Sequence, residues 1–133
     1  MSEQIAYGRT VTVDMEFGEA VERVKSLLQE QGFGILSEID VGKTMKAKIG
    51  EDFPPYLILG ACTPQLAHRA LLAENQLGLL LPCNVVVQSK DGKTVVSAVD
   101  AQKMLDIVGN PELRDIARDA NERLQVVIGQ VSA

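Results

Sequence analysis

The side chains best suited to nucleophilic, acid–base or metal-ligand chemistry are two cysteines and the single histidine. Cys62 stands just before Thr63-Pro64, and a hydroxyl N-cap followed by proline is typical of a helix start. Unpaired N–H groups at that start favour an anion, so we expect the helix to lower the pKa of the Cys62 thiol. His68 follows one turn later, and its ring should lean back towards the helix start. The spacing therefore predicts that Cys62 and His68 line one shared site.

Cys83 and Asn84 follow a proline at the entry to a predicted strand. If that strand neighbours the one ending in Cys62, both thiols and His68 could meet at one edge of a sheet. Two cysteines and a histidine would suit a soft metal, yet the spacing C-x5-H-x14-C matches no ordinary zinc motif, so we expect no metal and no cofactor. Each residue also has a structural alternative: free cysteines often pack in cores, a lone histidine often makes one hydrogen bond, and Asn84 could cap a turn. The ligand-binding candidates are Cys62, Thr63, His68, Cys83 and Asn84, and no residue is assigned a catalytic role.

Glu38 and Asp40 lie two residues apart on a predicted strand, a spacing compatible with paired carboxylates. Lysines follow at positions 43, 46 and 48. The mixture of charges favours a solvated ion-pair surface over an acid–base site.

The composition bounds the class of protein. A chain of 133 residues with 46% hydrophobic and 23% charged residues fits one globular domain, spanning 1–133, with a single core. The formal net charge of -5 would repel a phosphate backbone, so nucleic acid is not an expected partner. No apolar run approaches the roughly 20 residues of a membrane helix, and the first residues do not resemble a signal peptide. Two cysteines are too few for a disulfide framework, so we expect a cytoplasmic protein that does not bind membranes.

Hydrophobic periodicity predicts the elements of the first half. Residues 5–13 read as one strand, and Asp14 as the N-cap of a helix that Gly32 ends in the left-handed conformation. Residues 32–41 alternate as in a half-buried strand, and 43–50 favour a short helix that ends at Gly50.

The second half continues the mixture. Residues 56–61 are a nearly continuous apolar strand, predicted to be buried on both faces, and a helix follows to about residue 75. Asp91-Gly92 between two β-branched runs, 84–88 and 94–99, predicts a hairpin. Asn110-Pro111 opens a helix over 111–130. The order of elements points to a compact α+β sandwich.

Three segments carry a family resemblance: EDFPPYLILGACTPQLAHRAL from Glu51 to Leu71, LGLLLPCNVVV from Leu77 to Val87, and GFGILSEIDV from Gly32 to Val41. They closely resemble domain-of-unknown-function family 302, over residues 8–106, with the C-terminal helix outside. The resemblance implies a two-layer α+β sandwich, with helices packed on one face of a mainly antiparallel sheet, similar to a single repeat of the TATA-binding-protein fold. It also implies a homodimer, but no activity. Thr63 departs from the asparagine common at that position in the family, although either side chain can cap a helix.

The leading hypothesis is a small, non-catalytic, homodimeric binding or regulatory module, with a small-molecule or anion ligand near Cys62. The alternative is a thiol-dependent redox or persulfide-carrying protein in which Cys62 works with Cys83 and His68. A third possibility is a purely structural protein without a site. The apolar run 77–81 is the predicted dimer contact.

Overall fold

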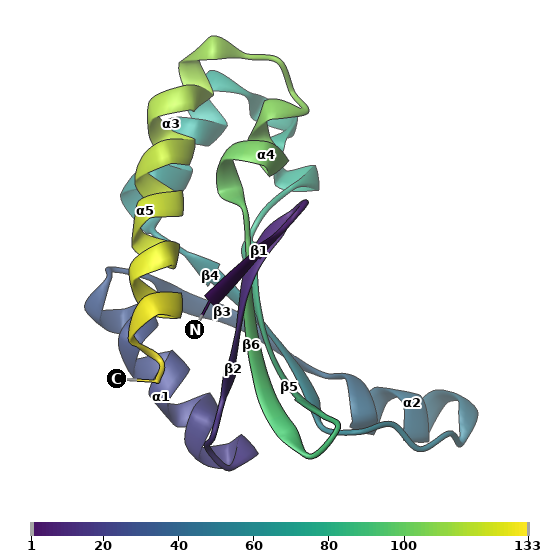
Figure 1. The fold of residues 1–133 in the computed structure, drawn as a ribbon. Helices are drawn as coiled ribbons and strands as arrows, with labels where there is room; N and C mark the ends of the chain where they lie inside the picture. The colour runs from purple at the N-terminus through teal and green to yellow at the C-terminus, as the bar shows by residue number, and fades with distance from the viewer. Residues whose placement is uncertain (1, 133) are drawn as a thin grey trace.

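The computed structural model describes residues 2–132 as one six-stranded sheet with helices (Figure 1). All five strand pairs are antiparallel, in the order β1-β2-β6-β5-β4-β3. The strands are β1 Ser2–Ile5, β2 Gly8–Val13, β3 Gly34–Asp40, β4 Tyr56–Cys62, β5 Cys83–Lys90 and β6 Lys93–Val99. The helices are α1 Phe17–Glu30, α2 Val41–Ile49, α3 Pro64–Ala73, α4 Ala101–Asp106 and α5 Arg114–Gln130, with short 3₁₀ helices η1 Asn75–Leu79 and η2 Pro111–Leu113.

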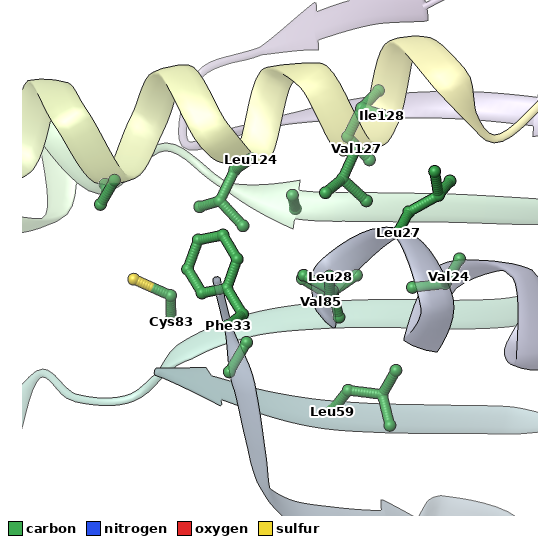
Figure 2. Packing of buried hydrophobic residues seen from close by; sticks show 14 of the residues in the cluster. Val24, Leu27, Leu28, Phe33, Leu59, Cys83, Val85, Leu124, Val127 and Ile128 are labelled. Atoms are coloured by element: carbon green, nitrogen blue, oxygen red, sulfur yellow. The ribbon is translucent and has the colours of Figure 1, made fainter. Parts of the chain in front are cut away.

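The helices α1, α3 and α5 lie on one side of the sheet, whereas α2 projects away on the other side (Figure 1). Buried apolar side chains from the helices and the covered sheet face form one cluster, part of which Figure 2 shows. The predicted fold class is therefore confirmed: an α+β protein with helices packed on one face of an antiparallel sheet.

Strands β5 and β6 show how the pattern of valines builds this core. Val85, Val87 and Val96 have no exposed surface, because they point to the helix layer. Val86 and Val95 point the other way and are only half-buried. Asp91 and Gly92 both have positive φ, 53° and 77°, as a two-residue type I′ hairpin turn requires. The predicted hairpin is confirmed, with its first strand extended to Cys83–Lys90 and its second to Lys93–Val99.

The ends of α1 follow from local hydrogen bonds. Glu16, not Asp14 as the sequence predicts, is the N-cap, and its carboxylate accepts from the backbone N–H of Gly18 at 2.9 Å. At the other end Gly32 has φ +84° and its N–H donates to the carbonyl of Gln29 at 3.0 Å. The predicted left-handed stop at Gly32 is confirmed, since this pattern is that of a Schellman cap.

Several boundaries differ from the predictions. Residues 5–13 are not one strand, because a turn at residues 6 and 7 separates β1 from β2, which then pair antiparallel. The strand predicted over 32–41 is an edge strand with a bulge between Ile35 and Ser37, so its alternation breaks and Ile39 is 48% exposed. The sequence patterns predict no element over Ala101–Asp106, which forms α4, and the C-terminal helix starts with the 3₁₀ turn η2.

The charged residues around β3 form solvated ion pairs, as predicted, but with other partners. Glu38 pairs with Lys25 on α1 at 3.1 Å, and Asp40 instead caps α2 by accepting from the N–H of Lys43. Lys46 pairs with Asp52 at 3.1 Å.

Gly60 lies where the backbone of β4 is approached from the uncovered side of the sheet. A Cβ atom there would overlap the side chains of Ser37 and Pro82. We expect Gly60→Ala to lower the free energy of unfolding by about 1–3 kcal/mol, the usual cost of forcing an extra carbon into a packed position.

Urea denaturation measures that change. Gly129→Ala is the matched control, because nothing lies within 4 Å of a Cβ at Gly129 on α5 and alanine is the better helix former, so up to about 1 kcal/mol of stabilisation is expected. Equal midpoints for Gly60→Ala and the wild-type protein would contradict the steric account of Gly60.

Candidate functional site

The pairing of β4 with β5 brings the two cysteines together at one end of the sheet. Ala61 is directly opposite Cys83, and Cys62 follows as the last residue of β4. Thr63 then connects β4 directly to α3. The strands that carry the two cysteines, β4 and β5, are therefore neighbours, as a site shared by both thiols requires.

A cavity of about 40 Å³ lies between this end of the sheet and the helices. Both thiols and Thr63 line it. Apolar residues from α3, from the loop after α1, and from α4 and α5 complete the lining. The apolar lining residues are Phe33, Ala61, Leu66, Ala67, Ala70, Leu81, Pro82, Leu105, Ile116 and Ala120. Figure 2 shows Cys83 beside the ring of Phe33 at one end of the buried cluster. No charged residue lines the cavity.

Thr63 also lines this cavity, but its hydroxyl oxygen is buried and has no hydrogen-bond partner. Thr63 is 6% exposed, and its Oγ1 is buried without a hydrogen bond. It occupies the predicted N-cap position of α3, yet its side chain caps no backbone N–H, so the capping role predicted from the sequence is wrong. Proline at the next position removes one donor, and the remaining N–H groups of the first turn have no intrahelical acceptor.

Burial raises the pKa values of the two cysteine thiols. It raises the pKa of Cys62 above the ordinary value of 9.0. It raises the pKa of Cys83 to about 11, and the neighbouring Cys62 adds to that rise. The expectation that the helix start would lower the pKa of Cys62 is therefore wrong: burial disfavours the charged thiolate and raises the pKa.

His68 lies apart from this cavity. It is exposed on α3, whereas Leu66 and Ala70 are the residues of that helix that are buried against the core. His68 is not among the residues that line the cavity. Cys62 and His68 therefore do not line one shared cavity, contrary to the prediction.

Asn84 lies on the opposite face of the sheet from Cys83, because successive side chains of a strand alternate. It is exposed, faces Gly60 across the strand pair, and lines a hollow of about 320 Å³ on the uncovered face. Of the five candidates, the structure brings together Cys62, Thr63 and Cys83, and separates His68 and Asn84 from them.

The sequence does not predict which apolar residues line the cavity. Phe33 follows the glycine stop of α1, and Leu105, Ile116 and Ala120 belong to α4 and α5, far from the cysteines in the chain. Helical periodicity marks Ile116 and Ala120 as buried, but nothing local in the sequence shows which helix faces which strand end. Over residues 2–132, no group of three or more His, Cys, Asp or Glu side chains is arranged to hold a metal ion.

These features define a class of protein: one antiparallel sheet, helices on a single face, and a small apolar cavity at the start of α3. The chain belongs to the family described as domain of unknown function DUF302, whose profile matches residues 9–131. The match includes α5, so the expectation that the C-terminal helix lies outside the family is wrong.

A solved structure agrees with this assignment. The chain is similar to the crystal structure of an uncharacterized conserved protein DUF302 from Bacillus stearothermophilus, with a TM-score of 0.87 and 30% sequence identity. The similarity covers 94% of this chain and 98% of that one. A search of curated proteins gave no match.

The exposure of the two cysteines predicts an order of reaction. We expect iodoacetamide to label Cys62 before Cys83 in the native protein, because Cys62 is half-buried, whereas Cys83 is 8% exposed and has the higher thiol pKa. Peptide mass spectrometry after timed labelling measures both rates. Modification of Cys83 while Cys62 remains free would contradict the prediction.

The raised pKa of Cys83 also predicts a pH dependence of stability. Above the ordinary thiol pKa of 9.0 the unfolded chain loses a proton that the folded chain keeps until about pH 11. The folded state is therefore stabilised below pH 9, and this contribution falls as the pH rises from 9 towards 11.

Urea denaturation of the wild-type protein and of Cys83→Ala between pH 8 and 11 tests this, since 9.0 and 11 bound the window of titration. Stability should fall less steeply with pH in Cys83→Ala. Parallel pH profiles would show that Cys83 does not titrate in this way.

Proposed function

We propose that this protein is a homodimeric, non-catalytic binding module of the cytoplasm, whose ligand site is the cavity lined by Cys62, Thr63 and Cys83. The observation that carries the proposal is the apolar cavity of about 40 Å³ at the start of α3, which Thr63 and both thiols line. Two free thiols fit a reducing compartment.

A binding role is better supported than the thiol-dependent alternative. Nucleophilic or redox chemistry at Cys62 needs a thiolate, but burial raises the pKa of both thiols. The only histidine does not line the cavity and so is not placed to accept the proton. The cavity thus offers an apolar surface without an activated nucleophile.

The homodimer has support from the uncovered sheet face. Half-buried apolar side chains lie on it, among them Tyr56, Val86 and Val95. On the same side of the sheet α2 projects into solvent and has no buried residue (Figure 1). Ile49 on α2 and Phe53 after it are 65% and 46% exposed.

A second copy related by a two-fold axis would cover the uncovered sheet face and α2 at once, because each chain has one such face and one projecting helix. The predicted contact through residues 77–81 finds little support. Leu77 is 1% exposed within the chain, and Leu80 and Leu81 pack against the core, which leaves Leu79 as the one apolar side chain of the run that is free to meet a partner. The proposed interface therefore lies on the open face instead.

Light scattering after size exclusion tests the dimer. We expect twice the chain mass of 14.4 kDa for the wild-type protein, and a monomer for Val86→Lys, since a charge would be buried in the proposed interface. Leu72→Lys is the matched control, because Leu72 is 75% exposed on the helix side, and it should remain dimeric. A wild-type monomer at micromolar concentration would contradict the proposed dimer. A Val86→Lys variant that remains dimeric would contradict the proposed interface.

Native mass spectrometry of protein purified without added metal tests the ligand site. We expect a small adduct on the wild-type chain that is lost in Ala67→Leu, because Ala67 lines the cavity and a larger side chain would fill it. Ser26→Leu on the exposed surface of α1 is the control and should keep the adduct. An adduct that persists in Ala67→Leu would place the ligand elsewhere.

A further inference from the structure

A groove between α4 and the first turns of α5 gathers positive charge in a chain that is acidic as a whole. The two helices pack against each other near one end of the molecule (Figure 1). The groove has a volume of about 330 Å³, and small-molecule sites commonly have volumes of about 300–1,000 Å³. Polar and apolar atoms both contribute to its surface, so a ligand there would meet both kinds of group.

Three cationic side chains line this groove, Lys103 from α4 and Arg114 and Arg118 from α5, against one carboxylate, Asp106. The charged residues of the lining therefore have an excess of two positive charges, whereas the chain has a net charge of -5. Arg118 pairs with Asp115 at 2.6 Å. Within the part of the chain that the structure describes, the side chains of Lys103 and Arg114 form no ion pair or hydrogen bond. One cation on each helix is thus available to an anion from outside the chain.

Gln102, which also lines the groove, adds an oriented hydrogen-bond donor. The side chain of Asn121 on α5 is buried, and its Oδ1 accepts from the backbone N–H of Ala101 at 2.9 Å. Its Nδ2 therefore donates to Oε1 of Gln102, at 3.1 Å. This contact leaves the NH2 group of Gln102 without an acceptor among the described residues, and a carboxylate oxygen would be a suitable one.

The inner surface of the groove is apolar. Leu105, Leu113 and Ala117 line it, and all three belong to the buried core cluster. An inorganic anion would leave this apolar surface in contact with water, whereas an organic anion would cover it and gain from the loss of apolar hydration. The arrangement of charge around an apolar surface therefore favours a ligand that has both a charged and an apolar part.

We propose that the groove between α4 and α5 binds a small organic carboxylate with an apolar body, such as an aromatic acid. Its carboxylate pairs with Lys103 and Arg114 and accepts a hydrogen bond from the NH2 group of Gln102, while its apolar body covers Leu105 and Leu113. This site goes beyond the binding function proposed for the cavity at the start of α3. Leu105 is the one residue that lines both.

Benzoate, benzamide and acetate are the matched probes. Benzamide has the size of benzoate without its charge, and acetate keeps the carboxylate without the ring. We expect millimolar benzoate to shift the backbone amide resonances of Lys103 and Arg114 and the side-chain NH2 resonances of Gln102 in 1H–15N NMR titrations. Benzamide and acetate should each bind several-fold more weakly, because benzamide lacks the ion pair and acetate lacks the apolar contact.

Substitution of the cations tests the site itself. Lys103→Gln and Arg114→Gln should each weaken benzoate binding roughly two- to fivefold, the effect of losing one exposed ion pair. Arg69→Gln is the matched control, because Arg69 is exposed on α3, lines neither cavity, and its loss changes the net charge equally. It should leave benzoate binding unchanged, and so should Ala67→Leu, which fills the cavity at the start of α3.

Equal affinity for benzoate and benzamide would overturn the carboxylate class, and acetate binding as tight as that of benzoate would overturn the apolar contact. Arg69→Gln weakening benzoate binding as much as Arg114→Gln would show an effect of net charge and not of this groove. Benzoate binding that Ala67→Leu abolishes would place the ligand in the cavity at the start of α3. No shift of the reporter resonances at tens of millimolar benzoate would overturn the site while leaving the proposed function intact.

Discussion

The antiparallel pairing of β4 with β5 is the constraint on which the rest of the structure depends. It sets Ala61 opposite Cys83, so the last residues of β4 and the first residues of β5 lie at the same end of the sheet. Because Thr63 is the one residue between β4 and α3, the helix must start at that end. A shift of this register by one residue would reverse the faces of β4 and move Leu59 and Ala61 out of the core.

The one-sided helix layer has two consequences. It concentrates the core on one face, where Leu59, Val85 and Val96 are completely buried. It also leaves the other face with half-buried apolar side chains that no element of residues 2–132 covers, apart from the close approach of Pro82 and Ser37 at Gly60. The two faces therefore serve different purposes: the covered face supports the cavity, and the open face is available to a partner chain.

The sequence predicts what local chemistry determines. Gly32, Gly50 and Asp91-Gly92 each require a positive φ, and all three stops or turns lie where the sequence places them. The valine alternation of β5 and β6 likewise identifies the buried face, because a period of two leaves no other choice. These signals recover the element types, the hairpin and the fold class.

The errors arise where packing between distant segments decides. The strand predicted over residues 5–13 splits because its first part folds back and pairs with its second, which alternation does not reveal. The strand after Gly32 is less buried than its pattern suggests because it is an edge strand with a bulge. The pKa of Cys62 is a further case: its neighbours in the sequence predict that the start of α3 lowers it, whereas burial in the folded chain raises it.

Thr63 shows most clearly how a strong local signal and the folded structure can disagree. Threonine followed by proline favours a capped helix, and a capping hydrogen bond typically contributes about 1 kcal/mol. Here α3 begins at the expected residue but without that bond, because backbone pairing and the burial of Leu66 and Ala70 suffice to fix the helix. The hydroxyl is then buried without a partner, where its isolation lowers stability. Burial of Leu66 and Ala70 against the core therefore outweighs the cost of one unpaired hydroxyl, about 1–3 kcal/mol, and packing between distant segments fixes the start of α3 without its cap.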